Sequence, residues 1–149
     1  MQQVMRVPVG GGPPQLVLEG RGINNIQCAR LPSTLCLYSE VSPGEEHFYT
    51  FDPVKGKGEE LRSVAMHDTD YYSFNWSLSP DGKLLAFSKK LGIQDNPVIR
   101  LFSLADSKEH PIPLPGWSGL ATLDWSAERV VALAALATVC VTPADVLTP

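Results

Sequence analysis

The stretch that decides the fold runs from Phe74 to Ser88 and reads FNWSLSPDGKLLAFS. Its first five residues alternate apolar and polar side chains, which is the pattern of a β-strand with one buried face. Three turn formers follow, since Pro80 presets φ, Asp81 can bond the backbone ahead of it, and Gly82 accepts a positive φ. The last five residues return as a nearly continuous apolar strand. The stretch therefore predicts a β-hairpin whose structural turn is Pro80, Asp81 and Gly82.

The same hairpin recurs along the chain. A weaker copy runs from Leu120 to Ala135, and its Ser126 aligns with Ser79 at a shift of 47 residues. An earlier copy, at 26–38, lies at a similar interval. A second hairpin follows the copy at 26–38 and the copy at 74–88, and it begins with an alternating strand at 48–52 and at 99–103, respectively. A repeat of this length built from strand–turn–strand units is the signature of a β-propeller blade.

We therefore predict an all-β fold, a partial β-propeller of about three four-stranded antiparallel blades. Residues 1–127 are predicted to form this fragment, with blade segments at about 1–20, 21–66 and 67–115 and the start of a next blade at 116–127. In residues 128–149 the alternation is lost and Glu128-Arg129 replaces the Asp-Gly pair. We expect this part to be an atypical tail, out of register with the repeat, as a change of reading frame would produce.

The composition narrows the classes of partner. The net charge is −4, whereas nucleic-acid binding requires a basic patch, so no nucleic-acid partner is expected. The N-terminus lacks the basic and apolar regions of a signal peptide. The longest apolar run, 130–141, is well short of the about 20 residues that cross a bilayer, so no membrane span is predicted.

Two cysteines are candidates for a disulfide. Cys28 and Cys36 lie on the two strands of one predicted hairpin, each four residues from Pro32. If the register pairs them, they are close enough to bridge, and a bridge would imply an oxidising compartment. The alternative is a pair of small buried thiols. Cys140 is expected to be free.

No motif in the chain predicts a chemical reaction. No GxSxG elbow or phosphate-binding glycine loop is present, and His47 and His110 each stand alone at the start of a strand. No enzyme activity, cofactor or metal is therefore predicted, and Trp76 and Trp125 are assigned to the core.

One loop between predicted blades offers weak candidates for binding. It contains His67, Asp68, Asp70, Tyr71 and Tyr72. Loops of this kind carry function in many folds, but solvated turn residues, with the tyrosines packed between blades, are the alternative.

A family resemblance accompanies these patterns. Residues 76–87, WSLSPDGKLLAF, resemble the SPDGKxLAF hairpin of WD-like (TolB-type) β-propellers, and 5–17 is similar to the outer hairpin of the same group. The resemblance implies a non-catalytic sensor or scaffold domain, as in the extracytoplasmic parts of bacterial membrane-anchored kinases and regulators. The same group of propellers also includes the gating domain of prolyl-oligopeptidase-type serine peptidases, so the resemblance implies this role equally.

We therefore expect a non-catalytic module for protein interaction or ligand sensing, a fragment of a larger bacterial protein located in the periplasm. The alternatives are a substrate-gating propeller without its hydrolase domain, and a gene fragment without independent function. Expected partners are a protein or peptide, the remaining propeller blades, or a second copy that pairs through open sheet edges.

Overall fold

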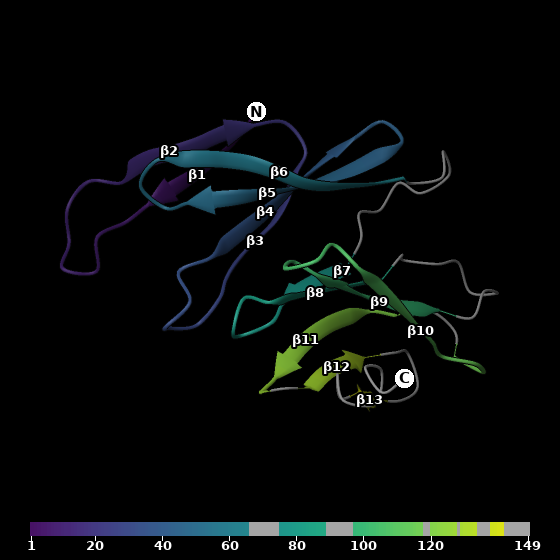
Figure 1. Ribbon diagram of the computed structural model, residues 1–149. Helices are drawn as coiled ribbons and strands as arrows, with labels where there is room; N and C mark the ends of the chain where they lie inside the picture. Colours follow the sequence, from purple (N-terminus) through teal and green to yellow (C-terminus); the bar gives the residue numbers. More distant parts are fainter. Residues whose placement is uncertain (66–74, 89–96, 118–119, 128, 134–137, 142–149) are drawn as a thin grey trace. The chain divides into compact units, whose positions relative to one another are not determined.

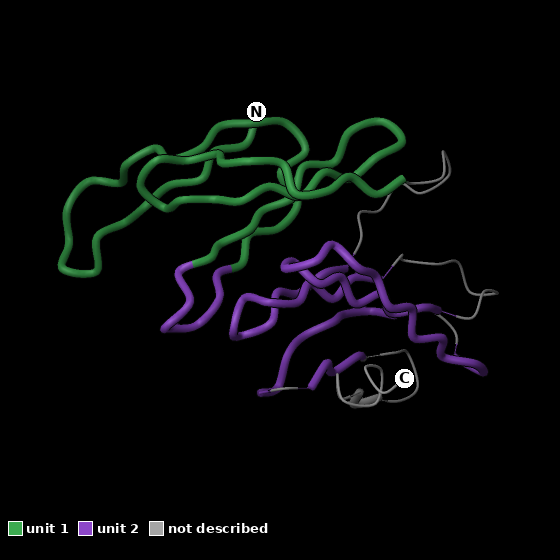
Figure 2. Tube along the Cα trace, viewed as in Figure 1, with its two compact units in different colours: residues 1–27, 35–71 green, residues 28–34, 72–149 purple. Residues whose placement is uncertain are grey.

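The computed structural model describes residues 1–65, 75–88, 97–117, 120–127, 129–133 and 138–141. Every regular element in this part of the chain is a β-strand, so the predicted all-β class is confirmed (Figure 1). The strands form four sheets, two of which are four-stranded, and none of the four closes on itself. The chain divides into two compact units, 1–27 with 35–71 and 28–34 with 72–149 (Figure 2).

The first unit holds a two-stranded and a four-stranded antiparallel sheet, the latter in the order β3-β4-β5-β6. Their strands are β1 (Gln2–Arg6), β2 (Gln15–Gly20), β3 (Ile23–Cys28), β4 (Cys36–Ser42), β5 (Glu45–Asp52) and β6 (Gly56–Ala65). Pro43 and Gly44 connect β4 to β5, with Ser42 opposite Glu45. Gly44 has a φ of 84°, as the residue after proline does in a type II turn, and glycine adopts it without strain.

The core of the first unit lies between these two sheets. Leu18 of β2 packs with Cys36, Tyr38 and Phe51 of the four-stranded sheet, and Val4 of β1 contacts the same cluster. Cys36 lies opposite Phe51 in the register, and Tyr38 opposite Tyr49, so these side chains share one face of the sheet. The polar cluster described below includes Tyr38 and Tyr49 of this face.

The second unit holds a four-stranded sheet, ordered β10-β9-β8-β7, and a three-stranded sheet, ordered β11-β12-β13. Their strands are β7 (Asn75–Leu78), β8 (Leu84–Ser88), β9 (Val98–Ser103), β10 (Glu109–Pro113), β11 (Thr122–Ser126), β12 (Arg129–Leu133) and β13 (Thr138–Val141). The prolines of β10 lie on a sheet edge, where a missing N–H breaks no ladder bond.

A single apolar cluster packs these two sheets together. Ala86, Ile99 and Leu101 of the first sheet contact residues of the second, including Trp125 and Val130. The Trp125 indole Nε1 donates a buried hydrogen bond to the Ser77 carbonyl oxygen at 3.0 Å. The assignment of Trp125 to the core is thus confirmed, and Trp76 is also buried.

The predicted turn between β7 and β8 forms around one buried hydroxyl. Ser79 Oγ accepts hydrogen bonds from the backbone N–H groups of Lys83 and Leu84 and donates one to Asp81 Oδ1 at 2.7 Å. Gly82 supplies a φ of 72°. Although burial raises the pKa of Asp81, its hydrogen bonds from Ser79 and the Lys83 backbone lower it below its usual value. The Ser79 hydroxyl and the Asp81 carboxylate are therefore both used in hydrogen bonds within the turn.

Beyond residue 127 the structure contains two further strands of the last sheet. β12 pairs antiparallel with β11, from Ser126 opposite Arg129 to Thr122 opposite Leu133, without a register shift. Ala127 adopts a φ of 55° at this turn, in place of the glycine used in the preceding hairpin. β13 then pairs with β12. The hydrophobic run from Val130 thus continues as sheet, even though the Asp-Gly turn is absent.

Candidate functional site

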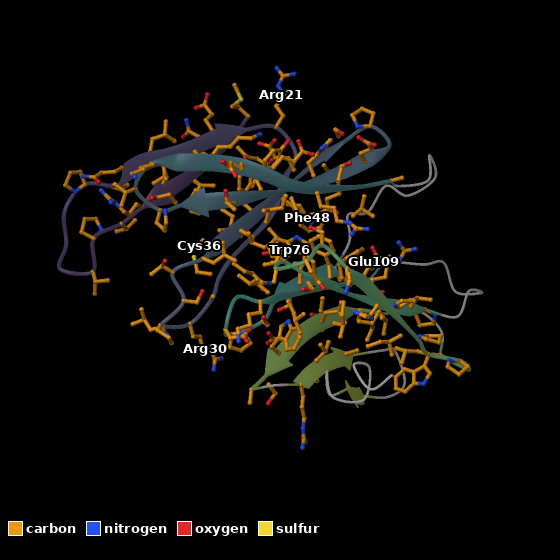
Figure 3. All side chains as sticks on the ribbon, viewed as in Figure 1. Arg21, Arg30, Cys36, Phe48, Trp76 and Glu109 are labelled. Atoms are coloured by element: carbon orange, nitrogen blue, oxygen red, sulfur yellow. The ribbon has the colours of Figure 1, made fainter. Side chains whose placement is uncertain are left out.

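The structure describes two of the three groups of residues singled out from the sequence. Cys28 and Cys36 are disulfide-bonded, at the end of β3 and the start of β4, and Figure 3 labels Cys36. Pro80, Asp81 and Gly82 form the turn described above. The loop candidates His67, Asp68, Asp70, Tyr71 and Tyr72 lie outside the described residues.

Among the described residues of the first unit, a group of interacting polar and aromatic side chains lies on β4, β5 and β6, and the sequence patterns missed it. We call it the Lys57 cluster, and it consists of Tyr38, Glu40, His47, Tyr49, Lys57 and Glu60. β4 and β5 bring its members together by register, because Tyr38 lies opposite Tyr49 and Glu40 opposite His47. β6 contributes Lys57 and Glu60 beside two register shifts in the β5–β6 ladder.

Lys57 makes the central contact of the cluster. Its Nζ lies 3.5 Å from the ring centroid of Tyr49 and 5.9 Å from that of Tyr38. The same ammonium group pairs with Glu40 Oε2 at 2.9 Å. A cation held over a ring face and against a carboxylate gains from both contacts. The rings of Tyr38 and Tyr49 are themselves stacked, with centroids 5.2 Å apart.

His47 extends the row of rings. It stacks against Tyr49 at a centroid distance of 6.2 Å, and its Nδ1 lies 2.9 Å from Glu60 Oε1. Its Nε2 is within hydrogen-bond distance of Ser42 Oγ, at 3.1 Å. His47, which belongs to no sequence motif, thus contacts these three side chains in the folded sheet. The missed signal was the alternation of Tyr38 with Glu40 and of His47 with Tyr49 on strands joined by a two-residue turn.

The pKa values of Tyr38 and Lys57 are both raised within the cluster. Burial is the largest cause that raises the pKa of Tyr38 to about 12, with the Lys57 hydrogen bond acting against it. Burial lowers the pKa of Lys57, but its hydrogen bonds to Glu40 and Tyr38 and their charges outweigh this, so the pKa lies above the usual 10.5. Both groups stay protonated near neutral pH, whereas general acid–base catalysis works best with a pKa near the operating pH. The cluster offers an ammonium group, carboxylates and the partly exposed rings of His47 and Tyr49, whereas the ring of Tyr38 is buried.

Neither a metal centre nor a spanning helix is found in the described part of the chain. No group of three or more His, Cys, Asp or Glu side chains there is placed to hold a metal ion. No helix among those residues is long and apolar enough to cross a membrane.

Comparisons with known proteins give no relative. No protein-family model matches the chain, and neither a curated protein nor a solved structure is significantly similar to it.

Proposed function

We propose that the chain is a non-catalytic β-propeller module for protein interaction or ligand sensing, part of a larger extracytoplasmic bacterial protein. The observation that carries the proposal is the arrangement of successive sheets in the second unit. Each follows chain order, and the first strands of the two sheets, β7 and β11, lie side by side. Blades of a propeller place their strands in this way around a central channel.

Hydrogen bonds between equivalent parts of successive repeats support the same arrangement. Asn75 Nδ2, at the start of β7, donates to the carbonyl oxygens of Leu120 and Ala121 just before β11, at 3.2 and 3.1 Å. In the same unit, the Arg30 N–H donates to the Pro80 carbonyl oxygen at 2.7 Å. This bond joins the loop between β3 and β4 to the turn between β7 and β8.

The disulfide supports the extracytoplasmic location. Disulfides persist in oxidising compartments such as the periplasm and are rare in the cytosol of most organisms. Cys28 and Cys36 are bonded at the base of the loop that carries Arg30, which Figure 3 labels.

The Lys57 cluster supplies recognition chemistry for such a module. The Lys57 side chain is 42% exposed although it is paired with Glu40, and Glu60 is also exposed beside His47. A peptide that carries a carboxylate next to an apolar or aromatic side chain matches a fixed ammonium over a tyrosine ring. We therefore assign peptide binding to this cluster.

The test is a selection of peptides on the full chain. A phage-displayed peptide library is selected against the protein, and the selected peptide is titrated by calorimetry. We expect saturable one-to-one binding, which Lys57→Met weakens by about tenfold or more because a partner's charge then loses its counterpart. Lys108→Met is the matched control, since Lys108 also pairs with a neighbouring carboxylate, Asp106 Oδ2 at 3.3 Å.

Three results would contradict the proposal in different ways. If no selected peptide binds saturably, the interaction role is refuted. Equal weakening by Lys57→Met and Lys108→Met would show that binding lies elsewhere. Hydrolysis of the bound peptide, read by mass spectrometry, would contradict a non-catalytic role.

A further inference from the structure

We propose that copies of this chain associate by pairing the edge of β1 in one copy with the edge of β13 in another. β1 ends a two-stranded sheet and β13 ends a three-stranded sheet among the described strands. An edge strand presents N–H and C=O groups that another strand can pair. The inference rests on these edges and does not require the binding role proposed above.

β1 lacks the features that protect the outer edges of the four-stranded sheets. β6 carries charged residues along its length, from Lys57 to Arg62, and β10 contains Pro111 and Pro113. Charged residues and prolines are the usual means of preventing edge-to-edge pairing. β1 reads QQVMR, with no proline and one charge, Arg6, at its end.

Exposed apolar side chains concentrate on the same hairpin. Met5 and Leu16 lie opposite each other in the register and are 43% and 53% exposed, while Val4 and Leu18 contact the core. Of the eight large apolar residues exposed in the described chain, five belong to this hairpin: Met1, Met5, Val7, Val9 and Leu16. A cluster of this kind marks an interaction surface.

The charges of the two edges indicate a second copy as the occupant. Arg6 is the single charged residue in positions 1–18, and positions 130–141 contain none. β13 carries no charge and β1 carries one, Arg6, at its end, so the two strands pair without burying an unpaired charge in the middle of the junction, which would oppose association. Among the described strands, one chain thus supplies both unprotected edges, and because a β1–β13 junction joins two different surfaces, further copies can add at the edges that remain free.

The test is sedimentation velocity of the full chain across a wide range of protein concentration. We expect a monomer at low concentration and a dimer or larger assembly at high concentration. Met5→Lys, or Leu16→Lys as a second variant, is expected to raise the dissociation constant by about tenfold or more, because it places an ammonium group at the junction. Leu61→Lys, an exposed apolar position on the protected strand β6, is the matched control and is expected to leave it unchanged.

A mixing experiment separates this pairing from other contacts. Val139→Pro and Cys140→Pro are made separately, because successive amides of a strand point to opposite sides. The one that removes an outward N–H is expected to weaken the dimer. Mixed with Met5→Lys, it should restore a heterodimer, since one intact junction remains. A wild-type chain that stays monomeric, equal effects of Met5→Lys and Leu61→Lys, or no heterodimer on mixing would overturn the proposal.

Discussion

Replacing Ser79 by alanine tests whether one hydroxyl holds the β7–β8 turn together. The change removes the Ser79 Oγ acceptor of the Lys83 and Leu84 N–H groups, at 3.1 and 2.9 Å, and the donor to Asp81. Lys83 N–H keeps Asp81 Oδ1 as an acceptor at 3.1 Å. The main loss is therefore the bond to Leu84 N–H. Ser79 is 3% exposed, so water replaces its hydroxyl poorly.

The expected loss follows from these partners. An N–H left without its acceptor in a buried site costs about 1–3 kcal/mol, and loss of the remaining bonds adds about 0.5–1.5 kcal/mol. We expect Ser79→Ala to lower the free energy of unfolding by about 1.5–4.5 kcal/mol, a large part of the about 5–15 kcal/mol typical of a domain. Urea unfolding followed by tryptophan fluorescence measures it, because Trp76 and Trp125 are both buried in this unit.

The next hairpin provides the matched control. Ser126 is the residue that aligns with Ser79, and it is exposed. Ser126→Ala is expected to change the free energy of unfolding by less than about 0.5 kcal/mol. If Ser79→Ala and Ser126→Ala have the same small effect, the reasoning that the hydroxyl organises the turn is refuted.

Three further outcomes are expected. Trp125→Phe removes the indole donor to Ser77 and should lower the free energy of unfolding by about 1–3 kcal/mol, measured by urea unfolding with circular dichroism. The absorbance of tyrosinate should show a group that titrates at about 12 and is lost in Tyr38→Phe, because the pKa of Tyr38 is raised on folding from 10.0. The contribution of this raised pKa to stability is complete below pH 10.0 and falls as pH rises through 12, and Tyr38→Phe should abolish that fall. Cys28→Ser opens the short loop closed with Cys36 and should lower the free energy of unfolding by about 2.5 kcal/mol, with dithiothreitol destabilising the wild type and leaving the variant unaffected.

Local sequence rules predicted the hairpins well because a hairpin is a local structure. The Pro80-Asp81-Gly82 turn and the alternation before it recur in the structure as β7, turn and β8. The run from Val130 shows the limit of the same rules. It lacks an Asp-Gly turn, yet β12 pairs with β11 in regular register, since Ala127 takes up the positive φ and Val130 is buried in the core.

The candidate site was harder to predict, because its contacts depend on register. Tyr38 and Glu40 read as part of a buried strand, and His47 as an isolated residue. A shift of one residue in the β4–β5 pairing would move the members of one strand to the opposite face of the sheet. The Pro43-Gly44 turn and the register shifts in the β5–β6 ladder place Lys57 against Glu40 and Tyr49.

The sequence by itself determined that this chain is all-β, where its turns lie and which strands form hairpins, because periodicity and turn chemistry act over a few residues. Only the tertiary structure decided which side chains meet across strands and which edges remain unpaired. The Lys57 cluster joins residues up to 22 positions apart across three strands, and the β1 edge is recognised as open only when the sheet order is known. Both depend on pairing between segments distant in sequence, which no local pattern encodes.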